Sequence, residues 1–164
     1  MIWPFLSLTV DDLIQEPLSS THADEISAIH AKTFDPSWSD GEFQALINTA
    51  HISGLIMRTP HNRGGEIVGF VLMRAVVGEA EILTIAIEPK WQQRGVGHAL
   101  MESVVKELKA KDISSLFLEV AEANWNAVKL YQRLGFEQVA TRKNYYHLRE
   151  GVKSNALVMR RDVV

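Results

Sequence analysis

The sequence predicts an α/β fold in which helices flank a mixed, mostly antiparallel sheet with one central pair of parallel strands. Three observations predict it. Short apolar runs separated by turn residues indicate antiparallel hairpins in the first half of the chain. An apolar run, a glycine-bearing turn and an amphipathic stretch then follow one another at residues 82–109. Another strand follows that helix, and such a strand-helix-strand crossover brings two parallel strands together.

The composition is that of a single globular domain, which we expect to span residues 1–164. A chain of this length buries roughly 70% of its unfolded surface, so it needs no stabilising crosslinks. It contains no cysteine, which excludes disulfides, thiolate metal sites and a cysteine nucleophile, and which suits a cytoplasmic protein. The six histidines are scattered without ligand spacing, so we expect no metal site.

Charge and hydropathy argue against two further classes. The formal net charge of −3 argues against nucleic-acid binding through a basic face. No apolar run approaches the ~18 residues of a membrane helix. The first residues, Met1–Leu6, are apolar but lack the basic start and the length of a signal peptide. We therefore expect a cytoplasmic protein that contacts neither nucleic acid nor membrane directly.

Turn and capping residues divide the first half into its expected elements. Residues 1–18 show no clear period and are assigned only as a lead-in, with a first strand near Leu6–Val10. A helix is expected to start at Thr21–Asp24 and to end before Asp35–Pro36, because the residue before a proline avoids helical conformation. A second helix should begin at the capping box Ser39–Glu42. The expected strands are 52–57 and 67–77, paired as an antiparallel hairpin, and 82–87.

The second half alternates helices and strands. The helix that follows the glycine-bearing turn has its apolar residues at three- and four-residue spacings: Leu100, Met101, Val104, Val105 and Leu108. A strand is predicted at Leu116–Val120. Asn124 can cap a helix to about Leu134, and Gly135 lies where a left-handed C-terminal residue belongs. Two more strands are expected at Phe136–Thr141 and Ala156–Arg161, separated by a polar loop at Arg149–Gly151.

The turn between the central strand and helix is a candidate anion site. It reads Gln92-Gln93-Arg94-Gly95-Val96-Gly97-His98-Ala99. The first backbone N–H groups of a helix have no intrahelical partners, and glycines let a ligand approach the backbone closely. A nucleoside triphosphate loop requires Gly-Lys-Ser/Thr, and a dinucleotide loop requires a third glycine where Leu100 stands. Both are therefore excluded, whereas a glycine-rich turn without a ligand fits these residues equally well.

Two further side chains are candidates for chemistry. Glu119 interrupts the apolar strand at 116–120, where lost solvation would raise its pKa toward the range useful for a general base. Its more ordinary interpretation is a strand-end carboxylate in water or paired with a lysine. Tyr131 shares a helix face with apolar residues, so its ordinary interpretation is a core tyrosine with its hydroxyl at the rim.

Several motifs together resemble the RimI branch of the Gcn5-related N-acetyltransferases (GNAT). They are Gln92-x-x-Gly95-x-Gly97 in the loop, Glu119–Asn124 after the strand, Leu130–Phe136 in the following helix and Arg142–Tyr146 beyond it. The resemblance covers roughly residues 20–161. It implies a GNAT fold, acetyl-CoA as cosubstrate and no metal. It also implies a protein acceptor, the N-terminal alanine of a small-subunit ribosomal protein, the eighteenth.

The resemblance also assigns roles to residues. It implies that Glu119 is the general base and that Tyr131 is the general acid near the sulfur. It implies that Asn124 contacts the cofactor. The strand segment that pairs with the pantetheine arm would be Ile85, Ala86 and Ile87. The pyrophosphate loop would be Gln93, Arg94, Gly95, Val96, Gly97 and His98.

Two departures from the family pattern leave the acceptor open. The segment Phe34–Trp38 is longer than the usual Phe-Pro-Trp-Ser, and Asn155 stands where an acidic residue is common. Both segments are expected to contact the peptide. Alternatives are another protein N-terminus, a lysine side chain or a small amine as acceptor, and a coenzyme A-binding module without catalysis. The oligomeric state cannot be predicted from these residues.

Overall fold

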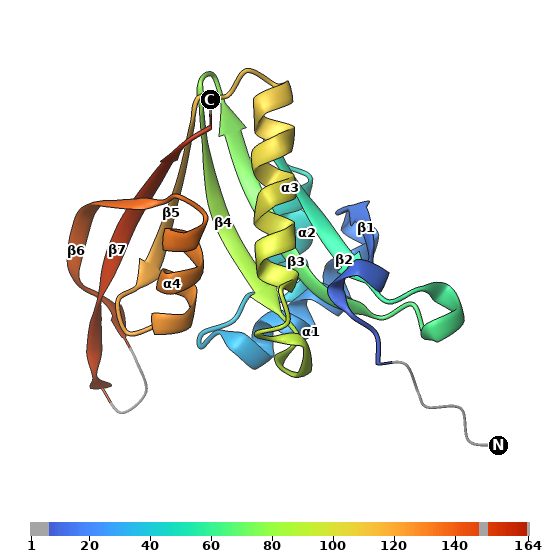
Figure 1. The fold of residues 1–164 in the computed structure, drawn as a ribbon. Helices are drawn as coiled ribbons and strands as arrows, with labels where there is room; N and C mark the ends of the chain where they lie inside the picture. The colour runs from blue at the N-terminus through green and yellow to red at the C-terminus, as the bar shows by residue number, and fades with distance from the viewer. Residues whose placement is uncertain (1–6, 148–150, 164) are drawn as a thin grey trace.

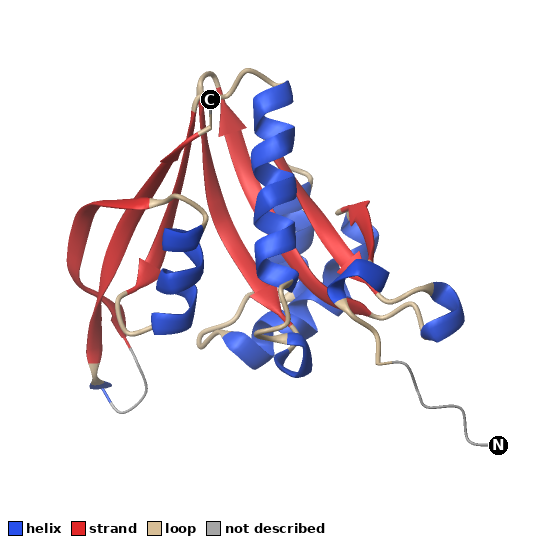
Figure 2. Cartoon of the chain, in the orientation of Figure 1, coloured by secondary structure: helices blue, strands red, loops and turns tan. Residues whose placement is uncertain are grey.

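The computed structural model describes residues 7–147 and 151–163, which form one seven-stranded sheet with helices on both faces (Figure 1, Figure 2). The strand order is β1-β2-β3-β4-β5-β7-β6, and only β4 and β5 pair in parallel. The predicted α/β fold and its parallel pair are therefore confirmed. The strands are β1 (Ile14–Pro17), β2 (Ile52–Arg58), β3 (Ile67–Val76), β4 (Glu79–Ile87), β5 (Ser115–Ala121), β6 (Glu137–His147) and β7 (Lys153–Asp162). The α-helices are α1 (Ala23–Thr33), α2 (Asp40–Ile47), α3 (Val96–Ala110) and α4 (Trp125–Arg133).

The helices lie in two pairs on opposite faces of the sheet (Figure 1). Helices α1 and α2 pack through Ile26, Ile29 and Phe43 against one cluster of sheet residues. Helices α3 and α4 belong to a second, larger cluster that includes Leu100 and Tyr131. Successive residues of a strand point to opposite faces, so the two clusters share the same strands without mixing.

The first strand does not lie where the sequence suggested. Leu6 is outside the described residues, and Leu8 and Thr9 are not in a strand. A 3₁₀ turn follows at Val10–Asp12, and the strand begins only at Ile14. The predicted strand near Leu6–Val10 is therefore wrong. Strand β1 has four residues, lies at the sheet edge and shows no alternating apolar pattern, so the sequence carried no clear signal for it.

Strand β6 is longer than predicted because it contains an irregular segment. Its register against β7 shifts between Arg142 and Tyr146, and Asn144 has a φ of 53°. With these bulged residues β6 extends to His147, whereas the sequence predicted that it ends near Thr141. Bulges of this kind re-aim side chains and are common beside active sites.

Strands β4 and β5 pair over a short length only. Their register consists of Glu79 with Ser115, Ala80 with Leu116 and Glu81 with Phe117. Beyond these pairs the two strands diverge, and Figure 1 shows the wedge that opens between their carboxyl ends. The sheet is therefore split at its centre, next to the predicted glycine loop. An extended ligand could pair with the unpartnered edge of β4 there.

Candidate active site

The glycine loop joins β4 to α3 at the open end of this split. After a 3₁₀ turn at Pro89–Trp91, the chain adopts left-handed conformations at Gln93 (φ 59°) and Gly95 (φ 86°). The side chain of Gln92 donates to the Ile87 carbonyl at 3.2 Å, which ties the loop to the end of β4. Two positive φ values within three residues turn the backbone sharply, and glycine at position 95 avoids the strain of a side chain.

The loop presents a run of unpaired amides. Within the described residues, none of the backbone N–H groups from 93 to 98 donates to a backbone carbonyl, and the first such bond of the helix runs from Ala99 N–H to the Gly95 carbonyl at 3.0 Å. Residues 92–95 are exposed in the part of the chain that the structure describes. Amides at a helix N-terminus carry partial positive charge. The loop can therefore bind an anion such as a diphosphate.

Two packing contacts hold the loop in this shape. The Arg94 guanidinium lies over the Trp91 ring, 4.1 Å from its centroid, and donates to the Leu8 carbonyl at 2.5 Å. At Gly97 a Cβ atom would come within 3.2 Å of the Leu130 side chain of α4. Glycine at position 97 thus lets α3 approach α4 closely.

The other two cofactor-binding candidates border the same split. Ile85, Ala86 and Ile87 lie on β4 beyond its last pair with β5, so only β3 pairs with them. Asn124 caps α4, because its side-chain oxygen accepts from the Ala127 N–H at 3.3 Å. The predicted cap at Asn124 is confirmed. Its amide group makes no hydrogen bond as a donor to any described residue and is free to contact a ligand.

Glu119 is not desolvated in the way the sequence suggested. Its side chain is 34% exposed, and its Oε1 accepts a hydrogen bond from Arg142 Nη1 at 2.7 Å. The expectation of a carboxylate buried in an apolar strand is therefore wrong. Alternation explains the difference, because Leu118 and Val120 point into the core beneath α4 while Glu119 points to the opposite face. The ion-pair partner of Glu119 is an arginine of β6, whereas the ordinary interpretation of the sequence suggested a lysine.

Tyr131 is a buried core residue, which agrees with the more ordinary interpretation of the sequence. It is 6% exposed, and its ring makes an edge contact with Phe136 at 5.8 Å. Burial raises the pKa of the Tyr131 phenol well above its usual value, and nearby Tyr146 raises it further. The phenol therefore stays neutral throughout the physiological range. Its hydroxyl forms no hydrogen bond with the described residues, so it is available as a donor.

Tyr146 connects the two candidate catalytic residues. Burial raises the pKa of Tyr146, and the charge of Glu119 raises it further. The same residue acts electrostatically on Tyr131. Tyr146 is therefore close enough to interact electrostatically with both Glu119 and Tyr131. Sequence reasoning assigned no role to Tyr146 or Arg142. Asn144 tolerates a positive φ, so it could have indicated the bulge. That bulge lies between Arg142 and Tyr146 and positions both.

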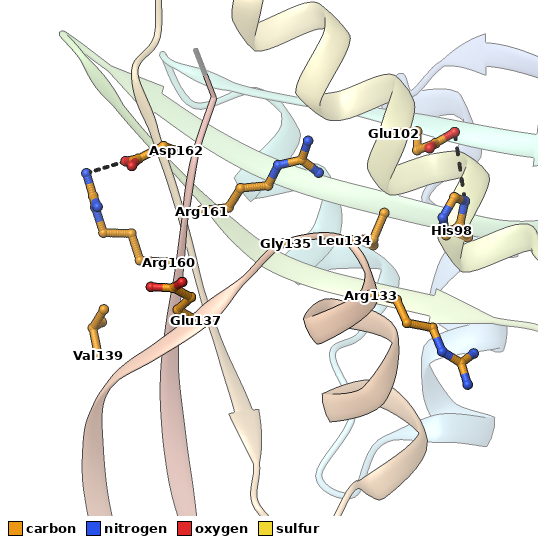
Figure 3. Close-up of a pocket in the computed structure, with 10 residues that line it drawn as sticks. All are labelled: His98, Glu102, Arg133, Leu134, Gly135, Glu137, Val139, Arg160, Arg161 and Asp162. Carbon is orange, nitrogen blue, oxygen red and sulfur yellow. Dashed lines mark ion pairs between the residues drawn. The ribbon is translucent and has the colours of Figure 1, made fainter.

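A cavity of about 540 Å³ lies beside the loop, between α3 and the C-terminal end of α4 (Figure 3). Its wall includes His98, the last residue of the loop, and three arginines, Arg133, Arg160 and Arg161. Arg160 pairs with Asp162 at 2.7 Å, whereas Arg133 and Arg161 form no ion pair within the described residues (Figure 3). The same wall carries three carboxylates, those of Glu102, Glu137 and Asp162, so the cavity has mixed charge.

The segment Phe34–Trp38 is held by a buried histidine. His30 stacks on Phe34 at 4.3 Å and on Trp38 at 5.1 Å, and its Nδ1 accepts from the Trp38 N–H at 3.0 Å. Burial lowers the pKa of His30 to about 4, so it is neutral at pH 7. The segment connects α1 and α2 and belongs to the face toward which Glu119 points.

The described residues contain no cluster of three or more His, Asp or Glu side chains that could hold a metal ion. No described helix is long and apolar enough to cross a membrane. The candidate groups at the site are the loop amides, the Glu119 carboxylate and the neutral Tyr131 phenol. Such groups can bind a phosphate-bearing carrier, accept a proton from a nucleophile and hydrogen-bond to a leaving group.

The chain is similar to known proteins over most of its length. The profile of the acetyltransferase (GNAT) family matches residues 23–136. The [ribosomal protein bS18]-alanine N-acetyltransferase of Haemophilus ducreyi is 33% identical over 122 residues, 74% of this chain and 81% of that protein. The enzyme of the same name from Escherichia coli is 35% identical over 97 residues, 59% of this chain and 65% of that protein.

Solved structures agree. The crystal structure of the ribosomal-protein-S18-alanine N-acetyltransferase from Escherichia coli superposes with a TM-score of 0.83 at 27% identity, covering 92% of this chain and 94% of that one. Arabidopsis thaliana NAA60 in complex with acetyl-CoA has the same fold, with a TM-score of 0.80 at 20% identity, and covers 92% of this chain and 98% of its own. The chain therefore belongs to the acetyltransferase (GNAT) family.

Proposed function

We propose that the protein transfers the acetyl group of acetyl-CoA to a protein N-terminal α-amine, and that its acceptor is the N-terminal alanine of ribosomal protein bS18. The observation that carries the proposal is the split between β4 and β5: the loop with unpaired amides follows β4, and Glu119 lies on β5 beyond its last pair with β4. The buried Tyr131 belongs to the core cluster that α3 and α4 share. The names of the relatives from Haemophilus ducreyi and Escherichia coli support the choice of acceptor. Such a reaction belongs to the cytoplasm.

The proposed binding of acetyl-CoA uses the α3/α4 face. The amides of residues 93–98 would hold the diphosphate, because they lack partners and lie at a helix N-terminus. The pantetheine arm would pair with the free edge of β4 at residues 85–87, as an added strand does. Asn124 would contribute its free amide N–H groups. This places the thioester within the split, close to Tyr131.

The acceptor would enter from the other face. Glu119 points to the face that carries α1 and α2, so an amine arriving there meets the carboxylate while the thioester lies behind the sheet edge. A reaction across the split keeps the two substrates apart until the amine attacks. Holding both reactants in line supplies much of the rate enhancement in such reactions.

The proposed reaction needs one proton acceptor and one hydrogen-bond donor. Glu119 takes a proton from the ammonium, directly or through a water, and the neutral amine attacks the thioester carbonyl to form the new C–N bond. The C–S bond then breaks, the sulfur leaves as a thiolate to which Tyr131 donates a hydrogen bond, and the extra proton on the attacking nitrogen is released to water as the neutral amide forms. Direct transfer requires no covalent enzyme intermediate. The chain has no cysteine that could form one.

The acidity of the amine favours an N-terminus over a lysine. A peptide α-amine with a pKa near 7.8 costs about 1 kcal/mol to neutralise at pH 7, whereas a lysine near 10.4 costs about 4 to 5 kcal/mol. A single carboxylate that water can reach suffices for the first but compensates poorly for the second.

Steady-state kinetics with four acceptors test the proposal. We expect the highest kcat/KM with a peptide that carries the bS18 N-terminus, and much lower values with the same peptide starting with a bulky residue, an N-terminally blocked lysine peptide and a polyamine. A preference for the lysine peptide or the polyamine would show that the proposed acceptor is wrong, while acetyl transfer itself would stand. Failure to turn over any acceptor, with acetyl-CoA bound, would support a binding module instead.

A further inference from the structure

Arg142 holds one oxygen of the Glu119 carboxylate and leaves the other open. Its Nη1 donates to Oε1 at 2.7 Å, while Oε2 accepts no hydrogen bond from a described residue. The two side chains come from strands that do not pair with each other, because β7 lies between β5 and β6. The ion pair therefore spans a neighbouring strand and fixes the carboxylate from outside β5.

Arg142 is itself held from a second side. Its guanidinium lies over the Tyr145 ring, 4.0 Å from the centroid. The contact with Glu119 is also the largest cause of a raised pKa for Arg142. A planar guanidinium can make an ion pair at its edge and stack with its face at the same time. The side chain is thus clamped between a carboxylate and an aromatic ring.

The position of Tyr145 depends on the bulge in β6. The Asn144 N–H donates to Asn155 Oδ1 at 3.0 Å, and Asn155 Nδ2 donates to Glu122 Oε2 at 2.9 Å. Asn155 is the residue that departs from the acidic pattern. An amide can accept from the bulge and donate to Glu122, whereas a carboxylate at position 155 could only accept. These contacts form a continuous chain. It runs from Glu122, just after β5, through Asn155 to the bulge in β6, and from Arg142 back to Glu119 on β5.

We propose that Arg142 is a positioning residue for the reaction: it fixes the rotamer of Glu119 so that Oε2 faces the acceptor amine. This inference rests on the proposed function of Glu119. A base that is oriented by a third group loses activity when that group is removed, even though the base remains. In this role Arg142 acts on the reaction through Glu119.

A double-mutant cycle tests the role. We expect Arg142→Gln to lower kcat/KM for the acceptor peptide by about tenfold, a fraction of the 10²–10⁴ that a positioned base contributes. The dissociation constant for acetyl-CoA should stay the same. In a Glu119→Gln background the same substitution should have no effect. Added guanidinium ion should restore part of the activity of Arg142→Ala. Arg74→Gln is the matched control, because Arg74 is an equally exposed arginine that pairs with Glu81 on the neighbouring strand.

Different outcomes overturn different statements. An active wild-type enzyme whose Arg142→Gln variant keeps the wild-type kcat/KM would overturn the role of Arg142 alone. An equal loss in the presence and absence of Glu119 would also overturn it, since Arg142 would then act independently of the carboxylate. A wild-type enzyme that binds acetyl-CoA but acetylates no acceptor would overturn the proposed function instead.

Discussion

Replacing Tyr131 by phenylalanine removes only the hydroxyl that we assign to the leaving sulfur. The unperturbed pKa of a phenol, about 10, lies above that of a thiol, about 8.5, so protonation of the thiolate by an ordinary tyrosine is uphill by about 2 kcal/mol. Burial raises the pKa of Tyr131 further, which makes full proton transfer still less favourable. The hydroxyl should therefore act as a hydrogen-bond donor to developing negative charge.

The expected loss follows from that role. A hydrogen bond to a charged group contributes about 1.5 to 3 kcal/mol. The hydrogen bond to the sulfur exists in the transition state only, so its loss lowers kcat by about 10- to 100-fold. The KM for acetyl-CoA stays nearly unchanged. The hydroxyl has no hydrogen-bond partner among the described residues, so its removal leaves no group unpaired. We expect the melting temperature to change by less than about 2 °C.

Release of coenzyme A measures the rate directly. A thiol reagent reports the product without background, because the chain has no cysteine. Phe136→Leu is the control for packing, since Phe136 contacts the Tyr131 ring at 5.8 Å. It should reduce stability more than Tyr131→Phe and kcat less. A kcat of Tyr131→Phe within twofold of the wild type would refute the assignment, and so would a loss confined to KM for acetyl-CoA.

Three further predictions concern the loop, the base and the buried histidine. Gly97→Leu forces a side chain against Leu130, where even a Cβ would lie at 3.2 Å, so calorimetry should show acetyl-CoA binding weakened at least about tenfold; normal binding would count against the loop. Glu119→Gln should lower turnover of the acceptor peptide with acetyl-CoA affinity intact, and an unchanged turnover would remove Glu119 from the mechanism. Burial lowers the pKa of His30 from 6.5 to about 4. Between these two pH values His30 is protonated in the unfolded state and neutral in the folded state. The free energy of unfolding therefore falls as the pH drops below 6.5. Urea unfolding should give a free energy about 2 kcal/mol lower at pH 5 than at pH 7.5, a difference that His30→Gln removes and that the exposed control His61→Gln keeps.

Much of the fold could be predicted because local signals agreed with the final structure. The capping box at Ser39 forms as expected, with the Glu42 N–H donating to the Ser39 hydroxyl at 3.2 Å and the Ser39 N–H donating to Glu42 at 2.8 Å. Gly135 adopts the left-handed conformation expected after a helix, with a φ of 83°. Caps and left-handed glycines depend on a few neighbouring residues, so they can be predicted from sequence alone.

The environment of the candidate base could not be predicted in this way. Which residue pairs with Glu119 depends on tertiary structure, because Arg142 lies 23 positions later on a strand that is not its neighbour. The number of pairs between β4 and β5 is likewise a property of the folded sheet. Sequence periodicity indicates that a crossover exists, but it carries no information on where the two strands separate.

Fragment-ion mass spectrometry of one product tests the central claim most directly. The substrate is an alanine-starting peptide with the bS18 N-terminus and an internal lysine, incubated with the protein and acetyl-CoA. We predict a single acetyl group on the alanine α-amine, and far less of this product with Glu119→Gln at neutral pH over the same time. An acetyl group on the lysine side chain, or a product that forms equally well without the Glu119 carboxylate, would contradict it.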